Sequence, residues 1–294
     1  MTKPDFIIIG AMKSATSTLH EQLAQQTGIF MSTLKEPNYF SDDNIYSLGE
    51  SWYDQIFKDA MPEDICGESS THYTKLPDYP LTLTRMGKRL KNPKLIYVMR
   101  HPIDRLISHY IHQWTQNVFK CDINKAIDQY EELTAYSCYV KQLAPYFEQY
   151  GHENVLPVFT ESLKVNPQKE LERVADFIGY KQPVFWRNEI LEQNVSNQRI
   201  RTFKGYGWLI ESRLMTLFRQ NIIPKSLRNK VKKGLMMTKR PEINQAQNVK
   251  LLALFDKDLA ELGAMLGVEL SCANFKDVVR EKELNWSGVY WNKR

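Results

Sequence analysis

The sequence predicts an α/β protein built on a central parallel sheet that is flanked by helices. Two apolar segments, 6–10 and 94–99, indicate buried strands, and each runs directly into a segment with helical character. A third apolar segment near 154–159 is also followed by a helix. Strands that alternate with helices form parallel sheets through crossover connections. With 294 residues, 43% of them hydrophobic, the chain can bury a sizeable core, and we expect a single domain over 1–294.

The elements can be justified in order from local signals. Segment 6–10 is Phe-Ile-Ile-Ile-Gly, without a polar side chain. Pro102 suits the first turn of a helix, because a first turn leaves its N–H groups unpaired in any case. The expected elements are a strand at 6–10, a helix at 14–26, a variable region at about 31–80, a helix near 80–91, a strand at 94–99, a helix at 102–116, helices over 122–150, a strand near 154–159, a helix near 167–178 and a largely helical remainder with a helix pair at 246–266.

The turn between strand 6–10 and the first helix is rich in lysine and hydroxyl groups. Backbone N–H groups at a helix start are unpaired and carry the positive end of the helix dipole, so they bind anions. Lys13 adds a full charge, and Ser14, Thr16, Ser17 and Thr18 add donors. Hydroxyl side chains in such turns also serve as helix N-caps, so this turn alone leaves a cap and an anion site equally open.

A second segment has the same organisation. Strand 94–99 ends in Arg100, and Ser108 lies about two helical turns further along the expected helix. In open α/β sheets, ligands bind at the carboxyl ends of the strands. Two anion-binding groups at this edge therefore favour a ligand with two separated phosphates over a simple helix cap.

The motifs at these positions resemble those of one enzyme family. The chain is similar to sulfotransferases that use 3′-phosphoadenosine 5′-phosphosulfate (PAPS), closest to the branch of heparan sulfate and other carbohydrate sulfotransferases and their bacterial relatives. The matching segments are 13–18, similar to the 5′-phosphosulfate loop; Arg100 with Ser108, similar to the 3′-phosphate motif; 35–40, similar to K-E-x-x-F-F; 67–73, similar to G-E-x-S-P-x-Y with Thr71 in place of proline; and 154–163 with 176–179. The resemblance covers most of the chain.

The resemblance implies a P-loop-like three-layer fold with a helical C-terminal part. It also implies in-line transfer of a sulfuryl group from PAPS to a hydroxyl or amine, with Lys13 neutralising the leaving phosphate and Glu36 as general base. The further candidates are the cofactor contacts Ser14, Ala15, Thr16, Ser17, Thr18, Arg100, Ser108, Lys239 and Arg240, and the substrate contacts Lys35 and His72. Lys233-Gly234 offers a competing register for the last basic pair. We expect no metal ion, because a sulfuryl group carries less charge than a phosphoryl group.

Two other classes of function stay open. A P-loop kinase should have a glycine before the lysine and an acid for Mg²⁺ at a strand end, where this chain has Met12 and Arg100. A non-catalytic anion- or glycan-binding protein of the same fold would share the motifs. Within the site, Glu36 could be only an ion-pair partner of Lys35, and His72 is the alternative base.

The net charge of +5 conceals one strongly basic segment. Between Arg199 and Arg240, twelve lysine and arginine residues face one acid, Glu211, and apolar residues are interleaved with them. Region 190–240 could close over the site as a lid, meet a membrane surface, or pack on the core. The acceptor class stays open among small molecules, lipids and glycans. We expect no nucleic-acid partner, and the sequence does not indicate an oligomeric state.

The cysteines and the N-terminus bear on the cellular compartment. Cys66, Cys121, Cys138 and Cys272 have no C-x-x-C spacing, which argues against a zinc site or a disulfide framework. The N-terminal apolar run is too short for a signal peptide, and no run approaches the length of a transmembrane helix. We therefore expect free thiols and a cytoplasmic protein.

Overall fold

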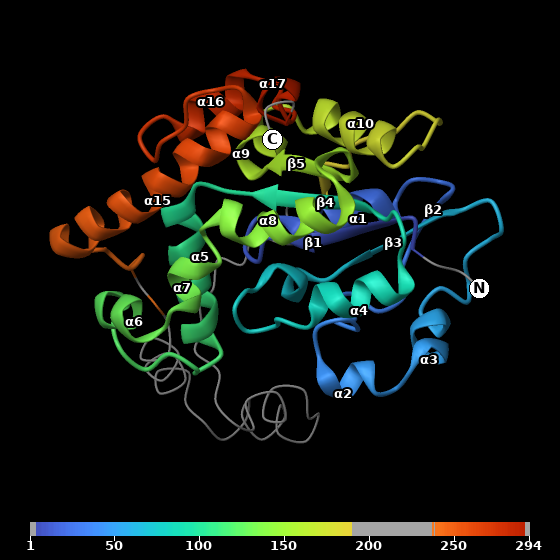
Figure 1. Cartoon of the computed structure of the whole chain (residues 1–294), viewed down its shortest axis with the longest axis horizontal. Helices are drawn as coiled ribbons and strands as arrows, with labels where there is room; N and C mark the ends of the chain where they lie inside the picture. The colour runs from blue at the N-terminus through green and yellow to red at the C-terminus, as the bar shows by residue number, and fades with distance from the viewer. Residues whose placement is uncertain (1–3, 190–236, 238, 292–294) are drawn as a thin grey trace, which may run out of the picture.

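The fold is a three-layer arrangement around one parallel sheet, seen in a computed structural model that describes residues 4–189, 237 and 239–291 (Figure 1). The five strands are β1 (Phe6–Gly10), β2 (Ile29–Met31), β3 (Ile65–Ser69), β4 (Lys94–Met99) and β5 (Val155–Phe159). Their order in the sheet is β2-β3-β1-β4-β5, and all four pairings are parallel. The structure confirms the predicted α/β class with a central parallel sheet.

Alternate residues along the strands supply two separate cores. Phe6 and Ile8 of β1 face the core that contains Leu19 and Leu23 of α1. Ile7 and Ile9 face the larger core on the other side, which is covered by α8 and α15. Both faces are buried because crossover helices lie on each side, which explains why the strand segments are almost entirely apolar.

The helices follow the predicted order, with one correction. They are α1 (Thr16–Ala24), α2 (Asp43–Tyr46), α3 (Glu50–Gln55), η1 (Thr71–Thr74), α4 (Thr82–Arg89), α5 (Pro102–Thr115), α6 (Ile123–Gln129), α7 (Glu132–Ala135), α8 (Tyr139–Tyr150), η2 (His152–Asn154), α9 (Thr160–Val165), α10 (Pro167–Phe177), α15 (Gln245–Leu266), α16 (Phe275–Glu281) and α17 (Gly288–Trp291). The helix pair expected over 246–266 is wrong: α15 is one helix of 22 residues. It packs on α8, and its buried apolar residues Leu251, Phe255, Leu259 and Leu262 recur at helical spacing without a break.

Strand β3 lies inside the region that the sequence left as variable, about 31–80, and β2 lies at the start of that region. β3 has the sequence Ile-Cys-Gly-Glu-Ser, which lacks a continuous apolar run, yet four of its five residues are buried. Gly67 pairs with Phe6 in β1, and a Cβ atom at Gly67 would lie 2.1 Å from the Phe6 ring. Glycine is therefore required there by packing, and the aromatic ring of the neighbouring strand fills the space.

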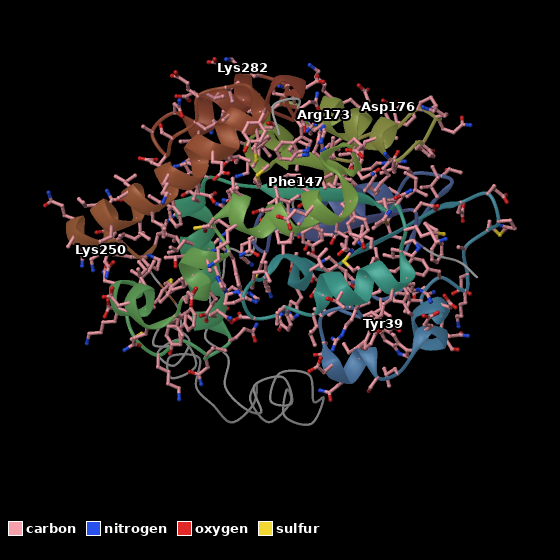
Figure 2. The ribbon with its side chains drawn as sticks, in the orientation of Figure 1. Tyr39, Phe147, Arg173, Asp176, Lys250 and Lys282 are labelled. Carbon is pink, nitrogen blue, oxygen red and sulfur yellow. The ribbon has the colours of Figure 1, made fainter. Side chains whose placement is uncertain are left out.

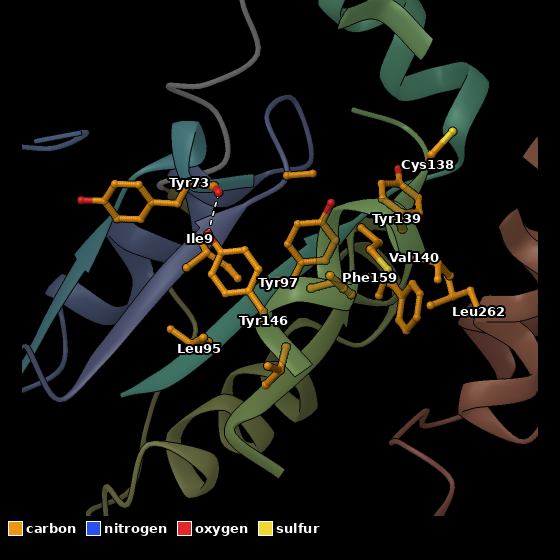
Figure 3. Close-up of a cluster of buried hydrophobic side chains, with 14 of the residues drawn as sticks. Ile9, Tyr73, Leu95, Tyr97, Cys138, Tyr139, Val140, Tyr146, Phe159 and Leu262 are labelled. Atoms are coloured by element: carbon orange, nitrogen blue, oxygen red, sulfur yellow. Dashed lines mark hydrogen bonds between the residues drawn. The ribbon is translucent and has the colours of Figure 1, made fainter. Parts of the chain in front are cut away.

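Tyrosines join the larger core to the edge of the sheet. Tyr97 of β4 and Tyr139 of α8 meet edge to face, with ring centroids 6.0 Å apart (Figure 3). Tyr146 of α8 donates a hydrogen bond of 2.5 Å to the carbonyl of Tyr73, which belongs to η1. Helix α8 thus supports η1, the short helix that follows β3 and borders the candidate site.

The C-terminal helices close the other end of the sheet. α15 packs on α8, and α16 packs on α9, next to β5 (Figure 1). On the outer side of β5, Arg173 of α10 donates to the Pro157 carbonyl at 2.6 Å and to Glu170 at 2.9 Å (Figure 2). The four cysteines are unpaired, and none of the described helices is both long and apolar enough to cross a membrane. The proposed lid, 190–240, lies almost wholly outside the described residues.

Candidate functional site

The candidate site forms where the direction of the chain's connections reverses. The chain leaves β1 toward β2 on one side of the sheet and leaves β4 toward β5 on the other, and β1 and β4 are neighbours. Such a switch point opens a crevice at the carboxyl ends of the two strands. Lys13 follows β1 and Arg100 follows β4, so both predicted anion-binding groups lie at this crevice.

The β1–α1 loop (residues 11–15) presents backbone donors rather than capping them. Lys13 and Ala15 have φ angles of 70° and 67°, in the left-handed region that non-glycine residues rarely adopt. Ala15 is the N-cap of α1, and no side chain makes a capping hydrogen bond there. The first-turn N–H groups of α1 therefore have no capping side chain. Of the two interpretations left open by the sequence, this geometry favours the anion site.

The loop is anchored to the sheet through the Ser14 carbonyl, and the Ser14 hydroxyl has no hydrogen-bond partner among the described residues. The single hydroxyl proton of Thr160, after β5, is shared between the carbonyls of Ser14 at 2.9 Å and Met99 at 3.0 Å. The Ser14 side chain is fully buried, yet its Oγ has no hydrogen-bond partner among the described residues. A buried hydroxyl without a partner is costly, so a ligand oxygen at this position would be favourable.

Three cations surround the loop. The Arg100 guanidinium donates to the Lys13 carbonyl at 3.3 Å, and the Lys35 ammonium donates to Ser17 Oγ at 2.8 Å. Burial lowers the pKa of Lys13, and the positive charges of Arg100 and Lys35 lower it further. An anion bound between the three cations would attract each of them and would offset their mutual repulsion.

The remaining predicted cofactor contacts are located less closely around the loop. Ser108 lies partly exposed on α5, two turns after Arg100. Arg240 pairs with Asp104 of α5 at 2.6 Å, and Lys276 of α16 pairs with the same carboxylate at 2.6 Å. These two cations hold the pKa of Asp104 below its usual value against the effect of burial. Lys239 is exposed. Arg240 is thus tied to the helix that carries Ser108.

One carboxylate oxygen of Glu36 is held by two hydrogen bonds, and the other makes only a longer ion pair. Its Oε2 accepts hydrogen bonds from the Thr71 backbone N–H at 2.9 Å and from the Thr71 hydroxyl at 3.0 Å. Its Oε1 lies 3.7 Å from the Lys35 ammonium, and the side chain is 29% exposed. Lys35 thus lies between Glu36 and Ser17 of α1. The two hydrogen bonds from Thr71, which are shorter than the Lys35 ion pair, hold Glu36 in place.

Behind Glu36, a second carboxylate is completely buried. Glu68 of β3 accepts hydrogen bonds from Tyr53 at 2.6 Å and Tyr73 at 3.0 Å on Oε1, and from Ser70 at 2.9 Å on Oε2. Burial raises its pKa to about 7, although the three hydrogen bonds oppose the shift. The aromatic side chains beside it are buried core residues: Tyr39 (Figure 2) stacks on Tyr53, and Phe40 meets Tyr53 edge to face.

The histidines near the site are packed side chains. The His72 ring stacks on Tyr79 with centroids 4.6 Å apart, and burial lowers its pKa to about 4. His101 Nε2 lies 2.9 Å from the Cys272 carbonyl, and its ring meets Phe275 edge to face. His109 stacks on Tyr136. These are the contacts of packed structural side chains, and they make His72 a weaker candidate base than Glu36.

Sequence reasoning missed a buried lysine. Lys75, just after η1, is only 8% exposed, and its ammonium lies 5.9 Å from the centre of the Tyr136 ring. Within the described part of the chain it has no hydrogen bond or ion pair. Burial lowers its pKa to about 8, and the nearby Glu36 carboxylate opposes this. Lys75 and Lys13 also both depress the pKa of His112, which places these three basic groups around one region. No motif marked Lys75, because only the fold brings it there.

Comparison with known proteins identifies the family. Residues 3–263 match the sulfotransferase domain. The chain belongs to the sulfotransferase family. Mouse heparan sulfate glucosamine 3-O-sulfotransferase 3B1 is 29% identical over 216 residues, which cover 69% of this chain and 53% of that protein. The membrane-associated sulfotransferase kil1 of Dictyostelium discoideum is 34% identical over 116 residues, or 38% of this chain and 24% of that protein. The chain spans about half the length of the mouse relative.

Solved sulfotransferase structures share the fold. A sulfotransferase from Alicyclobacillus acidocaldarius superposes with a TM-score of 0.65 at 21% identity, covering 92% of this chain and 98% of the other. Mouse sulfotransferase SULT7A1 complexed with PAP, adenosine 3′,5′-bisphosphate, gives 0.50 at 17% identity, covering 88% and 86%. These findings confirm the predicted family and its P-loop-like fold.

Proposed function

We propose that this sulfotransferase transfers a sulfuryl group from PAPS to a hydroxyl group, with Glu36 as the general base. The observation that carries the proposal is the meeting of Lys13, Arg100 and the uncapped start of α1 at the β1–β4 crevice. Lys35 connects this cationic loop to Glu36 through contacts of 2.8 Å and 3.7 Å. The solved PAP complex of a mouse relative supports the choice of nucleotide.

The residues present fit such a cofactor. The unpartnered Ser14 hydroxyl, the first-turn N–H groups of α1 and the Lys13 ammonium would hold the 5′-phosphosulfate. Arg100 and Ser108 would hold the 3′-phosphate, for which the planar guanidinium suits two-point contact. Arg240, anchored to α5 by Asp104, would close over the nucleotide.

The chemistry of the chain's own residues follows from charge. PAPS supplies the sulfuryl group and a bisphosphate leaving group. Lys13 would stabilise the charge that develops on the leaving oxygen, which is electrostatic catalysis by a fixed cation. Oε1 of Glu36 would accept the proton of the attacking hydroxyl, while Thr71 holds Oε2 in place. Lys13 lies in the loop after β1 and Glu36 in a turn fixed by Thr71, so both groups would be positioned before the acceptor arrives.

On the acceptor side, the basic groups favour a glycan that carries negative charge. Lys75 is a buried cation without an anionic partner within hydrogen-bonding distance in the described residues, close enough to Glu36 to be affected by its charge. An acidic group beside the reacting hydroxyl would offset its cost of burial. Relatives named as heparan sulfate sulfotransferases support this acceptor class.

Ligand-dependent thermal unfolding tests the proposed nucleotide. PAP without added metal should raise the melting temperature of the purified protein by several degrees, because ligand at about 100 times its dissociation constant adds roughly 2.7 kcal/mol. ATP with Mg²⁺ should do much less. Arg100→Ala should remove most of the PAP shift, whereas Arg280→Ala, a change at an exposed arginine of α16, should leave it intact.

Each other result has a defined meaning. A larger, Mg²⁺-dependent shift with ATP would replace the sulfotransferase proposal with a kinase. The absence of a shift with either nucleotide would indicate a binding protein of this fold that does not take the cofactor. Transfer from radiolabelled PAPS to heparan sulfate then tests the acceptor class, with a carboxyl-reduced, desulfated and N-acetylated preparation of the same polysaccharide as the uncharged control.

A further inference from the structure

We propose that Glu68 is a positioning residue for Glu36, acting through Ser70 on the turn that carries the base. The inference rests on the proposed function, because it concerns how Glu36 is held for proton transfer. The Glu68 side chain does not reach the crevice, because Glu68 is completely buried behind the Glu36 turn (residues 35–38). Its influence on the reaction must therefore pass through other residues.

The Glu36 turn has a backbone that needs external support. Glu36 and Asn38 have φ angles of 56° and 52°, both in the left-handed region, and a proline lies between them. Such conformations cost free energy unless neighbouring structure holds them. Two hydrogen bonds do so: the Glu36 N–H donates to the Ser69 carbonyl at 3.0 Å, and the Asn38 N–H donates to Ser70 Oγ at 3.0 Å.

The second of these bonds depends on the charge of Glu68. Ser70 has one hydroxyl proton, which it donates to Glu68 Oε2 at 2.9 Å, so an oxygen lone pair is left to accept from Asn38. Tyr53 and Tyr73 donate to the other oxygen. Three donors aimed at one carboxyl group suit the ionised form, which only accepts. Protonation of Glu68 would place its O–H group against the hydroxyl donors around it. It would thereby disturb the hydrogen bonds that Ser70 makes to Glu68 and to the Asn38 N–H.

The groups that face Glu68 come from every element around it. They are Tyr53 from α3, Tyr73 from η1, Ser70 from the end of β3, and Glu36 from the opposing turn. A cation, Arg89, lies over the Tyr53 ring at 5.2 Å. Burial raises the pKa of Glu68 to about 7, and the negative charge of Glu36 adds to the rise. Glu68 therefore changes charge within the pH range in which the enzyme would be assayed.

Two variants separate positioning from general support. Ser70→Ala and Tyr53→Phe each remove one hydrogen bond to the same buried carboxylate, but only Ser70→Ala breaks the connection to the Glu36 turn. The reactions to measure are transfer from PAPS to heparan sulfate and, independently of any acceptor, hydrolysis of PAPS by water. Ser70→Ala should lower kcat by about tenfold or more, because small misplacements of a reacting group are costly.

The control should differ in its pH profile. In the wild type, kcat should rise as pH increases through about 7, where Glu68 ionises. The Tyr53 hydrogen bond lowers the pKa of Glu68, so Tyr53→Phe should move this rise to higher pH while the upper plateau stays unchanged. Glu68→Gln, which cannot ionise, should lose the rise near pH 7 and stay at a low rate. The PAP dissociation constant should be unchanged in all three variants.

The outcomes distinguish this inference from the proposed function. If the wild type binds PAP and turns over, but Ser70→Ala and Tyr53→Phe lose the same fraction of kcat, Glu68 is only structural. Retention of the rise near pH 7 in Glu68→Gln would also overturn the role. A wild type that does not bind PAP, or that binds it and shows neither reaction, would overturn the proposed function and this inference together.

Discussion

The β1–α1 loop and the Glu36 turn face the same crevice but are built in different ways. The loop is made by neighbours in sequence: Lys13 and Ser14 follow β1 directly, and Ala15 begins α1. The turn is held by residues far along the chain, since Glu36 is fixed by Thr71, 35 residues away, and Asn38 by Ser70. In the loop, donors lack partners; in the turn, the carboxylates are already hydrogen-bonded.

This difference separates two tasks. Open donors and repelling cations in the loop can bind an anion with little rearrangement, because the missing partner is the ligand itself. Satisfied carboxylates in the turn are held in one orientation, which proton transfer requires. Changes in the loop should therefore affect the leaving group and the nucleotide, and changes in the turn should affect the chemical step alone.

The largest effect is expected at Lys13. Lys13→Ala should lower the transfer rate by about 10²–10³, because it removes one fixed charge that stabilises the leaving oxygen. The fold should survive, since the Lys13 side chain makes no hydrogen bond within the described structure. The measurements are kcat with PAPS and the melting temperature, with exposed Lys58→Ala as the matched control. Near-normal turnover by the folded Lys13→Ala protein would remove Lys13 from the mechanism.

A change at Glu36 should affect the rate of transfer but not the binding of the nucleotide. Glu36→Gln should lower kcat by about 10²-fold without lowering the affinity for PAP, because the Glu36 carboxylate acts as a base on the acceptor. Calorimetric titration with PAP and initial rates with PAPS give the two quantities, and Glu63→Gln at an exposed position is the control. If PAP affinity falls in parallel with kcat, Glu36 supports the nucleotide site and the proposed distinction between loop and turn is wrong.

The same difference explains what the sequence could predict. The strands β1 and β4 are local patterns, and they predicted the parallel sheet correctly. Lys13 and Arg100 follow these strands as expected, and their binding roles stay predictions. The role of Glu68 and the burial of Lys75 depend on contacts across the fold, with Tyr53 and Tyr136 respectively, that no spacing reveals. β3 was missed because Gly67 and Glu68 break its apolar run. The acceptor side is therefore the part that needed the structure.

A smaller effect is expected for Lys75, which tests whether the acceptor side of the site also recognises charge. Lys75→Met should raise the KM for heparan sulfate by about tenfold, the loss expected from one charged contact of 1.5–3 kcal/mol that is partly replaced by packing. PAP affinity should not change. The effect should shrink above pH 8, because the pKa of Lys75 is lowered to about 8 and the wild type then loses its charge too. Lys125→Met, at an exposed lysine of α6, is the control, and equal KM values would exclude Lys75 from acceptor binding.

The smallest effect concerns the link between the two regions. His20 of α1 bonds through Nδ1 to Ser69 Oγ at the end of β3, at 2.8 Å, and burial followed by the charge of Lys35 lowers its pKa to about 4. The unfolded chain binds a proton below pH 6.5 and the folded chain only below about 4, so stability should fall as pH drops through this window. The limit is about 3 kcal/mol, at 1.36 kcal/mol per pKa unit.

His20→Asn can keep a hydrogen bond to Ser69 but cannot titrate, so its free energy of unfolding should depend less on pH between 6.5 and 4. Denaturant unfolding at pH 7.5 and pH 5 measures the difference. The lowered pKa values of His72 and His112 act in the same window in both proteins and cancel in the comparison. His20 holds α1 against the end of β3, where the Ser69 carbonyl and the Ser70 hydroxyl support the Glu36 turn. Acid should therefore loosen the contact between loop and turn before it unfolds either. Identical pH dependence of the two proteins would show that His20 is protonated without cost and that the link lies elsewhere.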